Sequence, residues 1–220
     1  MSTSKLIKNK ILKSKGSFFA NDNISEFVGK NDLDNLSIEL QEAISKVLDV
    51  LIIDTQNDHN TKETAKRVAK MYLEEVFVGR YTPMPKITQF PNTKNLDEIY
   101  TLGPITIRST CSHHMVPITG KAWIGVLPSD KLIGISKFVR LTNWIMNRLQ
   151  IQEESTIQLA DLIEKLIKPR ALGVIVEATH NCMTVRGVKE NETKMTTSVM
   201  RGLFRDGSSA RTEFLKLIGK

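Results

Sequence analysis

Residues 105–127, ITIRSTCSHHMVPITGKAWIGVL, decide the fold class that this sequence predicts. From Ile105 to Cys111, apolar or small side chains alternate with Thr106, Arg108 and Thr110, a period of two that is typical of a β-strand. The segment from Lys121 to Leu127 predicts a second strand. We expect the two strands to be connected as a hairpin.

Upstream of this hairpin the period changes to that of helices. Apolar residues from Leu36 to Leu51 recur at spacings of three and four, which predicts an amphipathic helix. A second helix is predicted from Asn60 to about Gly79, because Asn60 followed by Glu63 is an N-terminal capping pattern. The three prolines in residues 81–93 indicate an extended connector.

Downstream of the hairpin, helices and strands alternate again. Ser136 is placed to cap a helix that carries Phe138, Leu141, Ile145 and Leu149. Another helix is predicted from about Gln152 to Lys168, with an inward face made by Ile157, Ala160, Ile163 and Ile167. Residues 172–179 and 182–188 predict two more strands, and residues 211–217 a closing helix.

This order of elements predicts an α+β fold, in which hairpin-connected strands carry helices on one face. We expect three parts along the chain. Residues 1–32 are polar and lysine-rich, which predicts a flexible basic arm. Residues 33–95 are predicted to be a helical region with its connector, and residues 96–220 the catalytic domain.

Composition narrows the choice of partner and compartment. The 220 residues hold 31 Lys and Arg against 24 Asp and Glu, a formal charge of +7, which suits an acidic partner such as a nucleotide, a nucleic acid or a membrane surface. No run of about 18 apolar residues predicts a transmembrane helix. The N-terminus lacks the apolar stretch of a secretory signal, so we expect a cytoplasmic protein.

Cysteine and histidine gather at two places in the chain. Both cysteines, Cys111 and Cys182, lie within three residues of a histidine, in the segments Cys111-Ser112-His113-His114 and His180-Asn181-Cys182. A lone cysteine is more often a core residue than a ligand, and a reactive thiol is a further alternative. Two such pairs that together contain every cysteine favour a metal site.

The chemistry of these residue types favours zinc, which takes thiolate and imidazole ligands in tetrahedral geometry. Cys111 and His114 have a common ligand spacing, and Cys182 could be the third ligand. Three protein ligands leave a position for water, as in catalytic zinc sites, where the pKa of that water falls to roughly 7. His113 and His180 then remain available to carry protons.

Two further groups of residues are candidates for binding a substrate. Basic side chains and one serine could hold a polyphosphate if the fold brings them together, although each alone is typical of a solvated surface. These residues are Ser136, Lys137, Arg140, Arg186, Arg67 and Lys70. Gln152 and Glu153 begin a predicted helix, where a glutamate usually only favours the helix dipole, but a carboxylate can also accept hydrogen bonds from guanine.

Several long motifs, in one order, resemble GTP cyclohydrolase I. They cover roughly residues 35–218 and comprise ETAKRVAKMYLEEVFVG (63–79), PMPKI (83–87), STCSHHMVPITGKAWIGVLP (109–128), LIGISKFVRL (132–141), QIQEE (150–154), VEATHNCMTVRGV (176–188) and TTSVMRGLFRDGSSARTEF (196–214).

The resemblance implies a T-fold, an antiparallel sheet with paired helices, and a homodecamer of two pentamers. It implies a hydrolase that uses zinc held by Cys111, His114 and Cys182, with His113 and His180 in proton transfer. By position, Gln152 and Glu153 match its guanine-binding pair. The same comparison assigns Ser136, Lys137, Arg140, Arg186, Arg67 and Lys70 to the triphosphate.

The implied reaction converts GTP to 7,8-dihydroneopterin triphosphate and formate. It proceeds by attack of a zinc-activated water on guanine C8, ring opening, an Amadori rearrangement and ring closure. The positive charge then suits a polyanionic substrate, and neither a nucleic acid nor a membrane partner is expected. The product feeds folate, other pterins and deazaguanine nucleosides alike, so the sequence leaves the pathway open.

Three positions depart from the usual pattern of the family: Ser112 where many members have Glu, Glu154 where many have Arg, and Ala65 where Pro is common. None removes a predicted ligand. One alternative is a chain that keeps the fold but has lost activity and acts as a binding partner, against which the intact site residues argue. Two other functions also compete with this interpretation. A 7-cyano-7-deazaguanine reductase would need a nucleophilic cysteine and a nicotinamide cofactor, and a nucleic-acid-binding protein with structural zinc would need a fourth protein ligand and interleaved aromatic residues.

Overall fold

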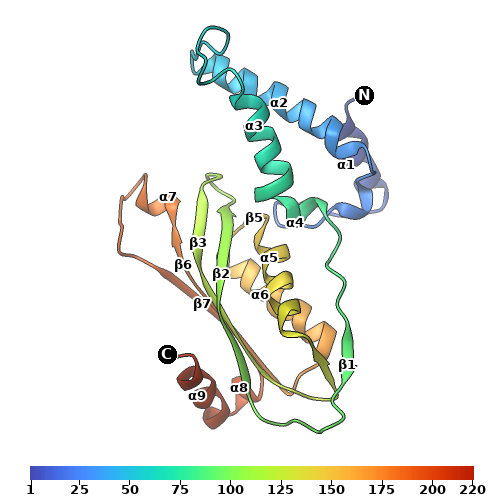
Figure 1. The fold of residues 1–220 in the computed structure, drawn as a ribbon, viewed down its shortest axis with the longest axis vertical. Coiled ribbons are helices and arrows are strands. Elements are labelled where there is room, and N and C mark those ends of the chain that lie inside the picture. The colour runs from blue at the N-terminus through green and yellow to red at the C-terminus, as the bar shows by residue number, and fades with distance from the viewer. The chain divides into compact units, whose positions relative to one another are not determined.

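The computed structural model describes residues 1–220, except for the side chain of Ser208. The chain divides into two compact units, Met1–Pro83 and Met84–Lys220 (Figure 1). The division falls inside the predicted connector, whereas the predicted boundaries after residues 32 and 95 stay predictions.

The first unit is helical. Its elements are α1 (Thr3–Lys13), the 3₁₀ turn η1 (Ser25–Phe27), α2 (Asp32–Val50), α3 (Thr64–Met71), the π-helical turn η2 (Tyr72–Val76) and α4 (Val78–Tyr81). The helix predicted over residues 36–51 is confirmed as α2. The helix predicted from Asn60 begins only at Thr64, because the N–H of Asn60 bonds to the carboxylate of Asp58 at 2.9 Å and closes a turn there.

The segment predicted as an arm contains a helix that the sequence analysis missed. Ile7 and Ile11, one helical turn apart on α1, are buried with Ile24, and Leu36 and Tyr81 pack against them. Hydrogen bonds also hold residues 18–23, since the side-chain amide of Asn23 donates to the carbonyls of Gly79 and Thr82 at 2.9 and 2.7 Å. Two isoleucines among many lysines are a weak sequence signal for a helix, because each isoleucine buries little area without its tertiary partners.

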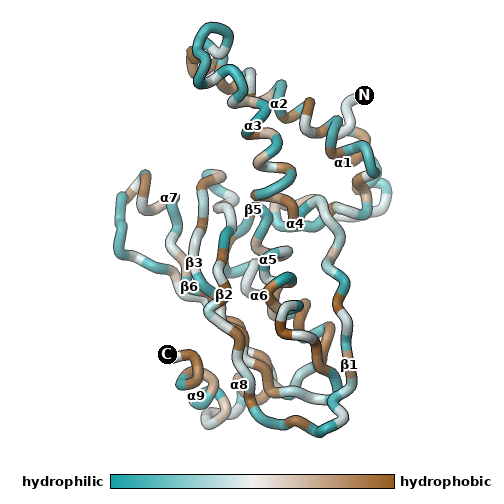
Figure 2. Tube along the Cα trace, viewed as in Figure 1, coloured by the Kyte–Doolittle hydropathy of each residue, from teal (hydrophilic) through white to brown (hydrophobic). Residues whose placement is uncertain are grey.

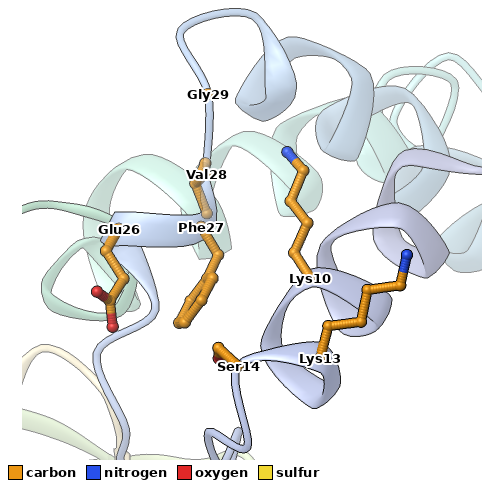
Figure 3. A pocket seen from close by; sticks show the side chains of 7 residues that line it. All are labelled: Lys10, Lys13, Ser14, Glu26, Phe27, Val28 and Gly29. Atoms are coloured by element: carbon orange, nitrogen blue, oxygen red, sulfur yellow. The ribbon is translucent and has the colours of Figure 1, made fainter.

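A surface hollow in this unit displays part of the positive charge of residues 1–32 (Figure 3). Lys10 and Lys13 extend from α1 across from Phe27 and Val28, with Glu26 on the same segment as Phe27. The lysines therefore stand on a folded helix with an apolar rear face.

The second unit is built on a five-stranded sheet in the order β5-β2-β3-β6-β7, made of Leu149–Gln150, Tyr100–Cys111, Pro117–Leu127, Ala171–His180 and Met195–Gly202. All pairings are antiparallel except that of β5 with β2. A separate pair joins β1 (Gln89–Pro91), in the predicted connector, to β4 (Lys131–Ile133). The predicted β2–β3 hairpin is confirmed, as is the strand predicted over residues 172–179.

The strand predicted over residues 182–188 is wrong. Residues Asn181–Thr184 form a short helix, α7, and the strand that pairs with β6 is β7, seven residues beyond the predicted segment's end. From Cys182 to Val185 the larger apolar side chains Met and Val alternate with Cys and Thr, which is typical of a strand. However, Gly187, with φ +62°, turns the chain away from the sheet.

Two helices cover one face of the sheet, α5 (Ile135–Met146) and α6 (Gln152–Ile167). Phe138, Leu141 and Ile145 lie on α5 as predicted and are buried, whereas Leu149, predicted on the same helix, lies on β5. Gly134 rather than Ser136 precedes the first residue of α5. Ile157 is 46% exposed, so its predicted inward position on α6 is wrong. Polar residues Gln152, Ser155 and Thr156 take the inward positions of the first turns instead.

The other face of the sheet is also covered, which corrects the expectation of helices on one face alone. There α8 (Leu203–Asp206) and α9 (Ser208–Leu217) bring Phe204 and Phe214 into a stack with ring centroids 5.1 Å apart. Phe214 lies over Gly125 and Gly173, which are paired across β3 and β6. The tube coloured by hydropathy shows apolar stretches along the strands between these helical layers (Figure 2). Of the helices in the described chain, none is both long enough and apolar enough to cross a membrane.

Adding one methyl group under Phe214 tests this packing. A Cβ at Gly173 would lie 2.5 Å from Cε1 of Phe214, closer than side chains approach, so we expect Gly173→Ala to lower the free energy of unfolding by about 1–3 kcal/mol. Chemical denaturation measures this loss. In a Phe214→Leu background the same substitution should cost clearly less, because the ring it meets is gone; equal costs in both backgrounds would contradict the assignment.

Candidate metal centre and active site

The first half of the site is the loop between β2 and β3. β2 ends at Cys111, whose N–H donates to the carbonyl of Val116 at 2.9 Å. The N–H of Met115 returns to the carbonyl of Cys111 at 2.9 Å, so the chain from Cys111 to Met115 forms a tight turn that carries His113 and His114. β5 pairs with the end of β2 and places Gln150 beside Cys111, and α6 begins directly afterwards at Gln152.

The second half comes from the end of β6. The pairing of β3 with β6 sets Ile118 opposite His180, so β6 ends beside the Cys111 loop. Cys182 follows on α7. The ligand atoms of Cys111, His114 and Cys182 all lie within 4.8 Å of one another. Two thiols and one imidazole at this separation fit a zinc ion, which binds sulfur at about 2.3 Å and nitrogen at about 2.0–2.1 Å.

The two thiols interact directly. Burial raises the pKa of the Cys182 thiol, and its hydrogen bond with Cys111 and the charge of that residue act in the same direction, while the nearby Arg186 acts against them. Two thiolates this close repel each other unless a cation lies between them. A metal ion supplies that cation, and metal binding then releases protons from the thiols.

Arg186 lies against the predicted ligand His114. Its Nη1 is 2.9 Å from Nε2 of His114, and because a guanidinium only donates, this imidazole nitrogen accepts. The ring of His113 lies edge-on to that of His114, with centroids 6.3 Å apart, and both rings are exposed. The structure thus brings one predicted triphosphate residue and one predicted proton carrier to the metal centre.

His180 is half-buried and bonded to Gln152. Its Nε2 lies 2.8 Å from Oε1 of Gln152. Burial lowers the pKa of His180, and the negative charge of Glu153 opposes that effect. The neutral imidazole is therefore favoured near neutral pH, which suits a residue that must both accept and donate a proton.

The predicted guanine pair is split by the structure. Glu153 is exposed, whereas Gln152 is only 3% exposed and its side chain is turned inward. The amide nitrogen of Gln152 donates to the carbonyls of Val176 and Met195, at 3.0 Å each, and to Oγ1 of Thr197 at 3.1 Å. Sequence analysis missed Thr197 and its neighbour Thr156 as site residues, because nothing in the local pattern links a residue of β7 to the start of α6.

The remaining predicted substrate residues lie on helices. On α5, Ser136 and Arg140 are exposed and Lys137 is half-buried, with its Nζ 3.0 Å from the carbonyl of Lys86. Arg67 and Lys70 are exposed on α3, in the first unit, where Lys70 pairs with Glu74 at 3.9 Å. Their predicted roles stay predictions. Ser112, one of the departures from the family pattern, donates its N–H to the carbonyl of Gln150.

Known proteins resemble the chain over most of its length. The family model described as GTP cyclohydrolase I matches residues 40–219. The chain belongs to the GTP cyclohydrolase I family. Curated proteins named GTP cyclohydrolase 1 are 37% identical to it, from Enterobacter sp. over 191 residues (86% of each chain) and from Aliivibrio salmonicida over 177 residues (80% of this chain and 81% of the relative). The one from Actinobacillus pleuropneumoniae is 37% identical over 190 residues, 86% of this chain and 87% of the relative.

A solved structure, that of the archaeosine synthase QueF-Like in the apo form, is similar with a TM-score of 0.36 and 12% identity. It covers 55% of this chain and 96% of that chain. Membership of the GTP cyclohydrolase I family, a family of enzymes, confirms the resemblance drawn from the motifs. It favours that interpretation over the reductase and the nucleic-acid-binding protein.

Metal binding gives a test that does not depend on turnover. We expect the purified protein to hold about one zinc per chain. Loss of a residue that only supports a metal ligand weakens metal binding by ~10–100-fold, so Cys182→Ala, which removes a ligand, should weaken it by more than that. Elemental analysis after equilibrium dialysis measures both. His113→Ala is the matched control, since His113 is outside the three-residue group, and it should keep its zinc. Equal loss in the two variants would contradict the assigned ligand set.

Proposed function

We propose that this protein is a zinc-dependent GTP cyclohydrolase I, which converts GTP and water to 7,8-dihydroneopterin triphosphate and formate. The observation that carries the proposal is the close approach of Cys111, His114 and Cys182, in a chain of this family, with His113, His180 and Arg186 around them. Cys111, His114 and Cys182 would hold the zinc. Zinc bound there supplies Lewis acidity, which makes a water molecule nucleophilic near neutral pH for attack on C8 of guanine.

Two histidines would move the protons. His113 is exposed beside His114, which suits proton transfer at N7 of the guanine as its five-membered ring opens and formate leaves. His180, held from one side by Gln152, suits proton transfer at the ribose during ring opening and the Amadori rearrangement that precedes ring closure. Because His113 is exposed and His180 is half-buried, we assign the two histidines to different proton-transfer steps.

Charge and hydrogen bonding would hold the substrate. Glu153 is exposed at the N-terminus of α6, where its carboxylate can accept from the ring N–H and the amino group of guanine. Cations would hold the triphosphate, and the donors assigned to it are Ser136, Lys137, Arg140, Arg186, Arg67 and Lys70. Arg186 lies beside His114, so the triphosphate end of GTP would lie on the side of the metal centre that this guanidinium faces.

The finer structural and cellular assignments follow from the family. We assign the sheet and its helices to the T-fold, and we propose a homodecamer of two pentamers in the cytoplasm. The outer edge of β7, and of β2 outside its two-residue pairing with β5, has no strand partner in the described chain, which supports assembly because an unpaired strand edge is a template for pairing with another chain. Analytical ultracentrifugation of the purified protein measures the size of the assembly.

Incubation with GTP tests the proposed reaction directly. We expect the zinc-loaded protein to release one formate per GTP and to form a pterin that fluoresces after oxidation. Cys182→Ala should do neither, because it lacks a proposed zinc ligand. Chelator-treated wild type to which zinc is restored is the control for metal dependence. Metal-replete wild type without formate release would overturn the proposal.

Removing one phosphate contact should act on binding. Arg140 is exposed on α5 one turn from Lys137, so we expect Arg140→Ala to raise the KM for GTP by about tenfold or more, the loss of a charge-assisted hydrogen bond worth about 1.5–3 kcal/mol. Steady-state kinetics at low and high salt measure the effect, which should shrink as salt screens the wild-type contact. Lys168→Ala, at the far end of α6 from Glu153, is a control for lost positive charge and should leave KM unchanged.

A further inference from the structure

The start of α6 buries polar side chains where a helix of this kind would usually bury apolar ones. Gln152, Ser155 and Thr156 are each 3% exposed or less. Burial of an amide without hydrogen bonds is strongly unfavourable, so buried polar groups are expected to have partners. The partners of Gln152 determine which way its amide faces.

Three acceptors surround one end of the Gln152 amide. The carbonyl oxygens of Val176 and Met195 can only accept hydrogen bonds, and both lie 3.0 Å from Nε2. The end of the amide that faces them must therefore be the NH₂ group. It follows that Oε1 is the end that faces His180, at 2.8 Å.

This orientation decides the tautomer of His180. The amide oxygen of Gln152 has no hydrogen to give, so the nitrogen of His180 that meets it, Nε2, must carry the proton. In the neutral ring the other nitrogen, Nδ1, then holds the lone pair. A histidine with a fixed tautomer presents one defined atom for accepting a proton.

The amide itself is held by a chain of hydroxyl groups. Thr156 donates its hydroxyl to the backbone carbonyl of Gln152 at 2.7 Å, and its hydroxyl oxygen lies 2.8 Å from that of Thr197, which accepts from the Gln152 side-chain amide. Thr197 can therefore donate to Thr156 while it accepts from Gln152. The cavity beside Gln152 and Ser155 measures about 10 Å³, room for about one water, so the Gln152 side chain has no space into which to withdraw.

We propose that Gln152 is a positioning residue that acts through His180, holding the ring with Nε2–H inward so that Nδ1 serves the substrate. This inference rests on the proposed function, in which His180 transfers protons at the ribose. It reassigns Gln152 from the guanine pair, because both ends of its amide are already bonded inside the chain, and leaves Glu153 to meet the base.

Kinetics with two nucleotides separate positioning from guanine recognition. Gln152→Met keeps the length of the side chain and removes its hydrogen bonds. In the zinc-loaded full-length protein we expect kcat for GTP to fall by about 10–100-fold, as for other groups that orient a reacting side chain, with KM within about twofold of wild type. The ratio of kcat/KM for GTP to that for inosine triphosphate, which lacks the 2-amino group, should stay as in wild type.

The matched control is Gln158→Met on the same helix, where the Oε1 atom is buried without a hydrogen-bond partner among the described residues, so wild-type kinetics are expected. Thr197→Val, which removes one acceptor of the Gln152 amide, should lower kcat by less than Gln152→Met does, again with KM unchanged. It serves as the second variant if Gln152→Met does not fold.

Two results would overturn the proposal: a raised KM with loss of the preference for GTP over inosine triphosphate, which would place Gln152 on guanine, or unchanged kinetics in both variants. Crystal structures of Gln152→Met and Gln158→Met supply a readout without turnover. The His180 ring should leave its single orientation only in Gln152→Met, and a ring unmoved there would also reject the proposal. Wild type without turnover would reject the proposed function alone.

Discussion

The pairing of β3 with β6 is the interaction on which the site depends. It runs without a register shift from Leu127 opposite Ala171 to Ile118 opposite His180. Ile118 follows the loop that holds Cys111 and His114, and His180 lies two residues before Cys182, so this one register joins the two halves of the candidate metal centre. A slip of one residue would turn His180 to the opposite face and shift the strand by about 3.3 Å, which would separate the ligands.

The two faces of the sheet make that register rigid in different ways. On one face, α5 and α6 bury aliphatic side chains against β2, β3 and β6, which fixes which face each strand turns inward. On the other, the Phe214 ring fills the gap that the paired Gly125 and Gly173 leave open, and no larger side chain fits at either position. The site thus stands at the end of strands that are packed from both sides.

Near the candidate metal centre, apolar packing gives way to hydrogen bonds. The first turns of α6 bury Gln152, Ser155 and Thr156, each bonded to a carbonyl or a hydroxyl group. Such a network is stable only when its members are satisfied together, which restricts each side chain to one orientation. In this way the core that stabilises the fold continues into the groups that orient His180.

By itself the sequence determined the elements whose periodicity is strong, β2, β3, β6, α2, α5 and α6, and the gathering of Cys111, His114, His180 and Cys182, because those residue types are rare in the chain and clustered. It did not determine α1, α7 or the inward face of α6, since local alternation does not say which partner a face meets. Only the tertiary structure decided the place of Gln152, whose partners lie 24 to 45 residues away along the chain. The physical reason is that a hydrogen-bond network is fixed by distances in space, which sheet register and helix packing set together.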